Sequence, residues 1–496
     1  MKILVDKDEH EALKAKNASL EFRLAQLEKM IFGRKSESYK HFVDPQQLSL
    51  LPESKKSVPQ VSAIEETTIL KKKVKIPRTA HGGRNKLPSN LPVEIIRVEP
   101  EQDTTGMKHI GDEITETLDY TPGVLKIRRY IRPKYVKQQT NVVPKKNSPQ
   151  IIIAPLPSRP IPKGISEAGL LAHIFVCKYI DHLPFYRLIQ RFKRDYGWDP
   201  SRTTVSGWFK GCCRLLQPLY NLLKQKILET DYLMVDETTF KVQEDCKGGK
   251  CFEGWFWLYE DPLSKLVIYD YQKDRSSVNP LDMLKDFTGH IQVDGHSSYR
   301  VVERKLPVTL LSCWAHARRK FVEAYDYDKK GVDEVLQLIK GLYKIEKDLR
   351  EQRVDHKQRF EVRQQKSKPL LVQIDKWMKS NAVNYPPSTP VAKAIQYSAN
   401  RWKELQVYIT DGKFEIDNNL VENSVRPVAL GRKNYLFAGS HKAAENAGMM
   451  YSFFTSCKRN DVNPFVWLKD VLERIPEQSI LKLDELLPSN WVGRCG

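Results

Sequence analysis

The stretch YLMVDETTFKV, residues 232–242, decides the fold of this chain. Its apolar, β-branched run leads into a carboxylate, which predicts a buried strand that presents Asp236 on one face of a sheet. Because alternate residues of a strand face opposite sides, Asp236 and Glu237 cannot serve one site together. Asp236 instead shares its face with Met234 and Thr238. The strand therefore offers a single carboxylate to any site on that face.

Two further blocks each supply one acidic residue from a different element. IQVDGHSSY, residues 291–299, places Asp294 at the end of a second strand-like run, and Gly295 follows where the backbone can turn sharply. Strand ends of open sheets are where ligands usually bind. EIDNNLVENSVRP, residues 415–427, places Glu422 on a predicted helix.

The helix predicted in this third block has a polar face. Asp417 can cap its N-terminus. Pro427 disfavours helical geometry at the residue before it, so the helix should end or bend there. A face that combines a carboxylate, amides and a guanidinium suits phosphate better than a hydrophobic core. By three- and four-residue spacing, that face carries Asn418, Asn419, Glu422 and Arg426.

Three carboxylates brought to one place repel each other unless a cation lies among them. Hard oxygen ligands of this kind suit Mg²⁺, which keeps several waters and takes further ligands from a substrate phosphate. The hypothesis is magnesium-assisted phosphodiester chemistry on DNA, with Asp236, Asp294 and Glu422 as ligands. An aspartate at a strand end is nevertheless structural far more often than functional. Asp270, also on a predicted strand, rivals Asp236 by spacing alone.

The charge of the chain favours a polyanionic partner. Its 496 residues include 81 Lys and Arg against 61 Asp and Glu, a formal net charge of +20. Neutralising phosphates releases condensed counterions, although a basic ribosomal or membrane-surface protein would share this excess. No run reaches the length of a transmembrane helix, and the N-terminus lacks an apolar signal core. The sequence therefore predicts a cytoplasmic protein without a membrane partner.

The eight cysteines do not form a disulfide framework in a chain of this length. Cys246 and Cys251 straddle KGGK and resemble half of a metal knuckle. No second pair lies at a matching spacing, so a hairpin loop is the favoured interpretation. We predict no structural zinc.

The first 90 residues predict a coiled coil followed by a linker. Residues 1–42 predict a leucine-zipper-like helix, because Leu13, Leu20 and Leu27 recur at heptad spacing. This favours a homo-oligomer; the alternative is a single amphipathic helix that packs on its own domain. Residues 43–90 are rich in Pro, Ser and Gln, then basic, and predict a linker with an arm that either grips DNA or is solvated surface.

The next two regions predict a β-rich module and a helix-turn-helix. Alternating residues within 91–163 indicate short strands, and 164–225 contains three amphipathic helical segments. Ser201 is a plausible N-cap for the third helix. A helix-turn-helix offers such a helix to the major groove, whereas the alternative is three-helix packing without a ligand. The residues exposed near its start are Arg202, Thr203, Thr204 and Ser206.

The rest of the chain predicts a mixed sheet interrupted by helices. Strand signals alternate with turns and a helix over 230–312, which suggests antiparallel hairpins followed by strand–helix–strand units. We assign 226–435 to this sheet domain, with a helical insertion at about 318–408. Residues 436–496 predict a C-terminal helical region. The predicted fold class is multidomain α/β.

Several blocks of the chain match one known family in order. They include VDETTFKV, VDGHSSYR, CWAHARRKF and DNNLVENSVRPVALGRKNYLFAGS, preceded by IFGRKSE, PLPSRPIPKG, KYIDHLPFYR and TTVSGW and followed by NPFVWLKDVL. On these blocks, which span nearly the whole chain, it resembles a transposase of the insertion sequence 66 family. That family belongs to a wider class with an Asp-Asp-Glu triad on a ribonuclease H-like fold. The resemblance implies that Asp236, Asp294 and Glu422 are the metal-binding triad.

One stretch departs from the family pattern. Family members commonly carry two cysteine pairs in the β-rich module, where this chain reads EPEQDTTGM and YVKQQTNVV. The zinc-finger position therefore has no cysteine, and zinc binding there is lost or replaced by packing.

The resemblance implies a DNA transposase that cleaves transposon ends and transfers the strands into target DNA. It implies two Mg²⁺ ions, with Mn²⁺ able to substitute, and Asp236 as their bridge. Expected partners are the terminal inverted repeats, target DNA and small accessory proteins of the same element, in a bacterial cytoplasm at the nucleoid. The alternatives are a ribonuclease H-like nuclease or resolvase that cuts without joining, and a non-catalytic dimeric DNA-binding regulator.

Basic residues near the triad are candidates for DNA contacts. His316 is a weaker candidate, because a histidine on a mixed helix is more often structural. Phosphate neutralisation is predicted for Arg318, Arg319, Lys320, Arg426, Arg432 and Lys433.

Overall fold

The computed structural model describes residues 87–137 and 151–493, apart from 88, 90, 122, 248 and 249. The predicted coiled coil and almost all of the predicted linker lie outside these residues, so both stay predictions. No helix in the described part of the chain is long and apolar enough to cross a bilayer.

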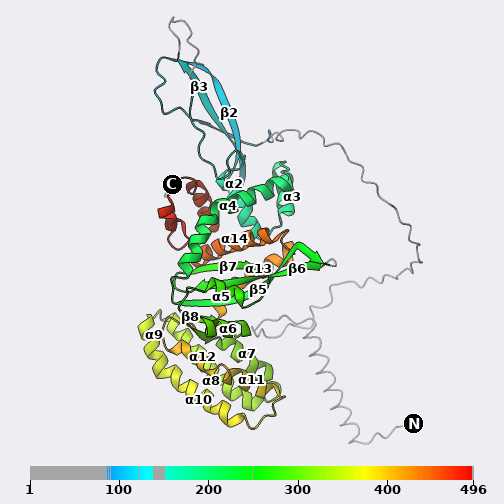
Figure 1. The fold of residues 1–496 in the computed structure, drawn as a ribbon, viewed down its shortest axis with the longest axis vertical. Coiled ribbons are helices and arrows are strands. Elements are labelled where there is room, and N and C mark those ends of the chain that lie inside the picture. Colours follow the sequence, from blue (N-terminus) through cyan, green and yellow to red (C-terminus); the bar gives the residue numbers. More distant parts are fainter. Residues whose placement is uncertain are drawn as a thin grey trace, which may run out of the picture. The chain divides into compact units, whose positions relative to one another are not determined.

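A five-stranded mixed sheet forms the centre of the fold, as predicted. Its order is β7-β6-β5-β8-β9, with β5, β6 and β7 antiparallel and β8 and β9 parallel to β5. In Figure 1 the strands run from β7, beside α14, to β8, beside the helical insertion. The central strand β5 carries Asp236. The bounds are β5 Tyr232–Lys247, β6 Lys250–Asp261, β7 Leu266–Gln272, β8 Gly289–Val293 and β9 Val308–Ser312.

Two short helices connect the strands of the parallel half. They are α5 (Val278–Met283), between β7 and β8, and α6 (Ser297–Lys305), between β8 and β9. The sequence predicted the first and missed the second. The missed helix is short and begins only three residues after Asp294, so its pattern merged with that of the strand end.

Three helices precede the sheet where the sequence predicted them. They are α2 (Ala168–Tyr179), α3 (Phe185–Tyr196) and α4 (Arg202–Ile227). The predicted cap is confirmed, because Ser201 Oγ accepts the backbone N–H of Thr204 at 3.0 Å.

The β-rich module contains one long hairpin in place of short strands. Its elements are β1 (Val93–Arg97), β2 (Met107–Thr121), β3 (Val124–Lys137) and β4 (Ile151–Ile153). The prediction of short strands is wrong for β2 and β3, which have 15 and 14 residues. Cross-strand ion pairs such as Arg129–Glu116 continue the pairing through the polar stretch.

The predicted insertion consists of helices joined by turns, with no strand among its described residues. Its residues Trp402–Gln406 contact β9, and within the insertion Trp314 Nε1 donates to the carbonyl of Leu405 at 2.7 Å. The following helix, α13 (Asn419–Tyr435), returns to the sheet and contacts β5. The insertion comprises α7 (Trp314–Ala324), α8 (Lys329–Glu351), α9 (His356–Val362), the π-helix η2 (Arg363–Ser367), α10 (Lys368–Asn381), α11 (Pro390–Ala399), α12 (Trp402–Gln406) and the 3₁₀-helix η3 (Val407–Ile409).

A buried ionic network holds the segment that leads from the insertion into α13. Arg363 and Glu346 are both 0% exposed, and Arg363 Nε donates to Glu346 at 2.8 Å. The remaining guanidinium donors of Arg363 reach the carbonyls of Tyr408, Asp411 and Phe414, each at 2.7 Å. One arginine thus fixes three carbonyl groups just upstream of α13.

The C-terminal helix α14 (His441–Arg459) runs along the edge strand β7. The hydroxyls of Ser452 and Ser456 accept the N–H groups of Tyr269 and Val267, at 2.8 and 2.9 Å. A Cβ at Gly448 would lie 2.5 Å from the carbonyl oxygen of Tyr269, so glycine permits this close approach. The helix therefore satisfies edge groups that another strand would otherwise bind.

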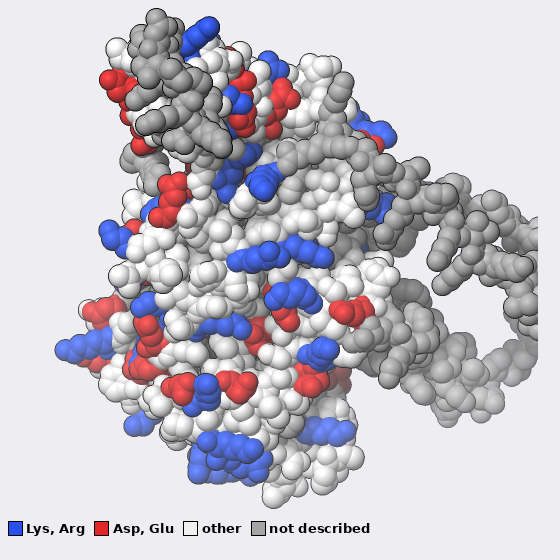
Figure 2. Space-filling model, turned by 45° about the horizontal axis from the view of Figure 1, so that its top comes forward, with Lys and Arg blue, Asp and Glu red and all other residues white. Residues whose placement is uncertain are grey.

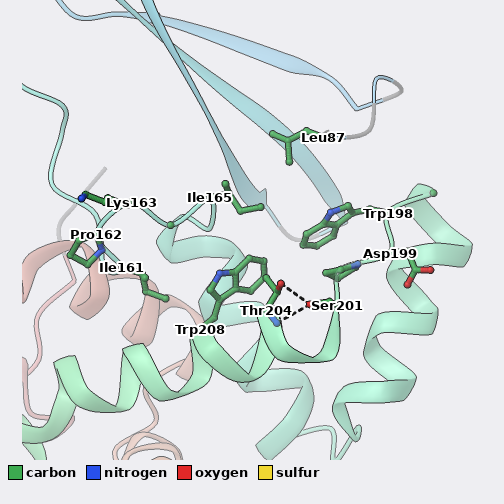
Figure 3. Close-up of a pocket in the computed structure, with 13 residues that line it drawn as sticks. Leu87, Ile161, Pro162, Lys163, Ile165, Trp198, Asp199, Ser201, Thr204 and Trp208 are labelled. Atoms are coloured by element: carbon green, nitrogen blue, oxygen red, sulfur yellow. Dashed lines mark hydrogen bonds between the residues drawn. The ribbon is translucent and has the colours of Figure 1, made fainter. Parts of the chain in front are cut away.

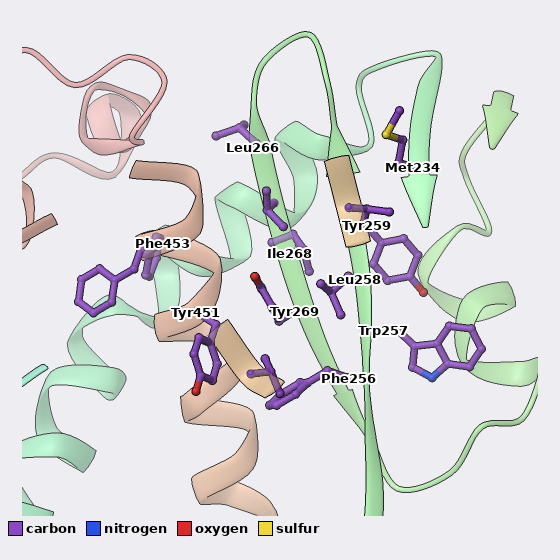
Figure 4. Packing of buried hydrophobic residues seen from close by; sticks show 14 of the residues in the cluster. Met234, Phe256, Trp257, Leu258, Tyr259, Leu266, Ile268, Tyr269, Tyr451 and Phe453 are labelled. Atoms are coloured by element: carbon purple, nitrogen blue, oxygen red, sulfur yellow. The ribbon is translucent and has the colours of Figure 1, made fainter. Parts of the chain in front are cut away.

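Aromatic packing anchors the same helix to the sheet. Tyr451 lies against Phe256 of β6 and Tyr269 of β7, with ring centroids 6.3 and 5.6 Å apart (Figure 4). The chain then ends in α15 (Pro464–Arg474) and the 3₁₀-helix η4 (Ile480–Leu486), and Trp467 of α15 packs on Phe453 of α14.

Ser456→Ala should destabilise the protein by about 1–3 kcal/mol, because it leaves the buried N–H of Val267 without its acceptor. Urea unfolding would measure this loss. Ser479→Ala is the matched control, since Ser479 is exposed and makes no capping bond, and should change stability by less than about 0.5 kcal/mol. Equal effects of the two substitutions would contradict the edge-strand role.

Basic and acidic side chains are interspersed on the face shown in Figure 2. The positive excess of the sequence thus does not gather there into one continuous patch. Net charge alone therefore does not identify a DNA-binding surface on this face, and individual basic residues have to be considered one by one.

Candidate active site

Strand β5 presents Asp236 and Glu237 on opposite faces of the sheet, as predicted. Asp236 is half-buried, and its Oδ1 accepts the backbone N–H of Glu237 at 2.8 Å. The side chain of Glu237 is 1% exposed and pairs with Arg275. Its other oxygen accepts the hydroxyl of Tyr299 at 2.5 Å. Glu237 therefore has its own partners on the core side of the strand, whereas Asp236 lies on the opposite face.

Asp236 lies among other carboxylates. Its pKa is raised well above the usual aspartate range, first by burial and then by the negative charges of Glu237, Asp294 and Glu422. The two acids predicted from distant blocks are thus close enough to Asp236 to act on its protonation. A carboxylate in this setting favours either a proton or a cation.

The rival aspartate on β7 lies in a different setting. Asp270 pairs with Lys224 of α4 and also accepts the side-chain amide of Gln272 at 2.6 Å. An aspartate already bonded to a lysine has its charge compensated by the protein. Asp270 is therefore a structural residue.

The turn after β8 fixes Asp294. Its Oδ1 accepts the N–H of His296 at 2.9 Å, and its carbonyl accepts the hydroxyl of Tyr397 at 3.0 Å. Gly295 has φ +93°, and Arg401 donates to its carbonyl at 2.9 Å. A Cβ at Gly295 would lie 2.5 Å from Arg401 Nε, so only glycine fits. The helical insertion therefore clamps the backbone that carries the second acid.

Tyr397→Phe should lower stability by about 1 kcal/mol, because it removes one donor to the Asp294 carbonyl. Burial raises the pKa of Tyr397 to about 12, so its hydroxyl stays a donor across the neutral range. Urea unfolding would measure the change, with the exposed Tyr327→Phe as control. A loss no larger than that of the control would show that this bond does not stabilise the turn.

Asn418 docks the helix that carries the third acid. Its side-chain amide donates to the carbonyl of Val235, immediately before Asp236, at 3.1 Å. Its backbone N–H donates to Cys313 Sγ at 3.2 Å. Glu422 follows one helical turn later, in the first turn of α13. The amide of Asn418 therefore sets the approach of Glu422 to β5.

The predicted cap of this helix is confirmed in part, and its predicted end needs correction. Asp417 accepts the N–H of Asn419, the first residue of α13, at 3.1 Å, although the N-cap position itself is Asn418, whose side chain makes no capping bond. The helix does not end at Arg426, because α13 continues through Pro427 to Tyr435. Proline removes only one backbone donor, and the carbonyl that loses it belongs to exposed Asn423, where water can replace it.

Cys313 and His316 lie beside Glu422. His316 Nδ1 is 3.7 Å from Glu422 Oε1, and the three ligand atoms, including Cys313 Sγ, lie within 4.8 Å of one another. The sequence predicted only a weak DNA contact for His316 and gave Cys313 no role. The available signal was the spacing in CWAH, which places both side chains at the start of one helix, α7.

The basic candidates on α13 divide into two kinds. Arg432 is half-buried and donates to Thr238 Oγ1 at 3.0 Å and to the carbonyl of Thr239 at 2.6 Å. It thus ties α13 to β5 two residues beyond Asp236. Arg426 and Lys433 are exposed, and Arg426 borders a pocket of about 650 Å³ that Lys458 and Arg459 also line.

The basic candidates on α7 are Arg318, Arg319 and Lys320, which follow His316 on the same helix. All three are half-buried, and Lys320 pairs with Glu323 at 2.9 Å. Their sequence position places them one to two turns from Cys313.

The residues at the start of α4 lie apart from the acids. Arg202 and Thr203 are exposed, but Thr204 is half-buried and borders a pocket of about 640 Å³ with Trp198 and Trp208 (Figure 3). The hydroxyl of Ser201 lies 2.8 Å from those of Thr203 and Thr204. Thr204 therefore lines this pocket, whereas Arg202 and Thr203 face solvent.

Comparison with known proteins identifies the chain. Residues 163–446 match the Transposase IS66 family, 452–489 match the IS66 C-terminal element, and 19–96 match a family described as Transposase C of IS166 homeodomain. The third match covers the predicted coiled coil from residue 19 onward and the whole predicted linker. The matches define a transposase, a class of protein that binds DNA and acts in its transposition. Within this class the chain belongs to the IS66 family.

Relatives in Sinorhizobium fredii (strain NBRC 101917 / NGR234) extend over most of the chain. The uncharacterized protein y4jD is 32% identical and covers 95% of this chain and 94% of its own length. The uncharacterized protein y4hP is 28% identical over 95% of this chain and 88% of its own length. The uncharacterized protein y4qI is 30% identical over 80% of this chain and 75% of its own length.

Proposed function

We propose that this transposase cleaves DNA at the ends of its element and joins the freed 3′-ends to target DNA. In this proposal Asp236, Asp294 and Glu422 are the catalytic, metal-binding triad. The observation that carries it is the placement of the acids: β5 and β8 are neighbouring strands, and the amide of Asn418 docks the helix of Glu422 on the carbonyl just before Asp236. The charges of Asp294 and Glu422 contribute, after burial and Glu237, to the raised pKa of Asp236, so the arrangement is electrostatically unfavourable unless a proton or a cation binds.

The sheet supports a ribonuclease H-like catalytic domain. Asp236 lies on the central strand β5, and Asp294 follows the neighbouring parallel strand β8. Glu422 arrives on α13 after a helical interruption. This order of two strand-borne acids and one helical acid is the one that the family resemblance implies.

The donor set fits Mg²⁺, since it offers carboxylate oxygens from three elements. Two bound ions, Mg²⁺ or Mn²⁺, would lower the pKa of the attacking water or 3′-hydroxyl and stabilise the leaving oxygen. The protein holds the ligands in place. The Asp236 carboxylate bonds to its own strand, the Asp294 backbone is clamped by Tyr397, and Asn418 docks the helix of Glu422. Asp236 is the expected bridge between the ions.

Exposed cations near the triad suit the phosphates of a DNA strand. Arg426 and Lys433 follow Glu422 on α13, so they can neutralise phosphates of a strand that runs along this helix from the reacting one. Arg202 and Thr203 at the start of α4 are the corresponding candidates for recognition of the element's ends. Further expected partners are a second copy of the chain and accessory proteins of the same element.

The test uses labelled DNA fragments that carry the element's ends, taken from the sequence flanking the gene. The full-length protein should nick them with Mg²⁺, not with EDTA, and should join the ends to a second DNA. Asp294→Asn should abolish cutting. The matched control is Asp270→Asn, which makes the same change of side chain on a strand of the same sheet, loses the pairing with Lys224, and should still cut.

The products separate the alternatives. Cutting without joined products would indicate a nuclease or resolvase. DNA binding without any cutting would indicate a regulator. Cutting by Asp294→Asn would remove the triad from the mechanism.

A further inference from the structure

Three chemically different ligand atoms meet at the start of α7. Cys313 occupies the N-cap position of this helix, and His316 follows three residues later. Glu422 approaches from α13, with its Oε1 3.7 Å from His316 Nδ1. The thiol sulfur, one imidazole nitrogen and one carboxylate oxygen all lie within 4.8 Å of one another. The distances between these ligand atoms are slightly longer than those between ligands of one small ion. Modest rotations of the three side chains would bring the atoms to binding distance.

We propose that Cys313, His316 and Glu422 bind a borderline-soft divalent cation, Zn²⁺ above all. Thiolate and imidazole are ligands that Zn²⁺ prefers and Mg²⁺ avoids. Three protein ligands with one open position form the usual set of an accessible zinc site. The sequence predicted no structural zinc from cysteine pairs, and this mixed site is of a different kind.

The sulfur of Cys313 lies behind the other two ligands, in contact with the first backbone groups of α13. Cys313 is 2% exposed, and its Sγ already accepts the backbone N–H of Asn418 at 3.2 Å. Burial raises the pKa of the Cys313 thiol, although the N–H groups of Asn418 and His316 act in the opposite direction, so a cation that binds here must displace the thiol proton. The side chains of His316 and Glu422 are 22% and 30% exposed. A cation can therefore enter from their side and reach the sulfur behind them.

Glu422 belongs both to this site and to the proposed magnesium site. If the proposed function holds, a zinc ion held by Cys313 and His316 draws Glu422 away from Asp236 and Asp294. Zn²⁺ binds nitrogen and sulfur ligands far more tightly than Mg²⁺ does, so excess Mg²⁺ does not displace it readily. The inference therefore makes Zn²⁺ an inhibitor of Mg²⁺-dependent DNA cleavage.

The binding test needs no catalytic activity. Metal-free full-length protein is titrated with Co²⁺, which should give a thiolate-to-cobalt charge-transfer band at one equivalent that Zn²⁺ abolishes. Cys313→Ser keeps a helix-capping residue and should remove the band. Both Cys313→Ser and His316→Ala should weaken Zn²⁺ binding by at least about 100-fold, since changes beyond the ligand shell alone cost about 10- to 100-fold.

The control is Cys251→Ser, which changes a half-buried cysteine on β6 outside the proposed site and should leave the band unchanged. A band that survives Cys313→Ser, or disappears in Cys251→Ser, would overturn the assignment. So would the absence of any band in the unaltered protein.

Activity provides the second readout. Each protein is compared with its own zinc-free cleavage rate, and Cys313→Ser should be inhibited far less by Zn²⁺ than the unaltered protein. Equal inhibition of both would also overturn the inference. If the cobalt band behaves as expected but no Mg²⁺-dependent cleavage occurs, the zinc site stands and the proposed function fails.

Discussion

Asp236→Asn is expected to stabilise the metal-free protein at neutral pH and to abolish DNA cleavage. The pKa of Asp236 is raised in the folded state by burial and by Glu237, Asp294 and Glu422. The ionised carboxylate therefore opposes folding. This penalty is absent below the unfolded pKa of about 3.9, grows as pH rises through that value, and is complete above the raised folded pKa. Asparagine keeps the shape of the side chain and removes the penalty.

Urea unfolding in EDTA between pH 4 and pH 8 measures this effect. The unaltered protein should lose stability relative to Asp236→Asn as the pH rises. Mg²⁺ should then stabilise the unaltered protein more than the variant, because ligand binding favours the folded state. Exposed Asp326→Asn is the control and should reproduce the unaltered pH dependence. A variant that is less stable than the unaltered protein at pH 8 would contradict the crowding of the acids.

Arg363→Ala is expected to destabilise the protein by about 3–5 kcal/mol. Arg363 and Glu346 are both fully buried, and truncation leaves the carboxylate without its main partner. It also removes the donors to the carbonyls of Tyr408, Asp411 and Phe414. Because this segment leads directly into α13, cleavage should fall with stability.

Denaturant unfolding again gives the measurement. Lys357→Ala, an exposed cation in the preceding helix, should change stability by less than about 0.5 kcal/mol. The double variant Arg363→Met with Glu346→Gln should recover part of the loss, because it removes both charges of the pair while buried Arg359 keeps its second partner, Glu415. A loss below about 1 kcal/mol for Arg363→Ala would show that the network does not hold the segment.

The sheet and its acids could be read from the sequence because their signals are local. An apolar β-branched run ending in Asp236, and another ending at Asp294 before Gly295, need only the geometry of a strand and a turn. The cap at Ser201 is local as well. Patterns of this kind can be predicted because the residues that form the structure are also neighbours in the sequence.

What the sequence could not supply depends on distant partners. The docking role of Asn418 requires the carbonyl of Val235, and the place of His316 requires Glu422 more than one hundred residues later. The helix continues through Pro427 because packing on β5 outweighs the loss of one backbone donor. Arg363 looks like any surface arginine until Glu346 and three carbonyls surround it.

The contact between α14 and β7 has a consequence for shortened copies of the gene. A chain that stops before His441 keeps all three acids yet bares the N–H groups of Val267 and Tyr269 along an apolar rim. Such fragments should therefore precipitate in the cell, instead of persisting as dominant competitors of the intact protein. Light scattering of the truncated chain beside the whole one would reveal the difference.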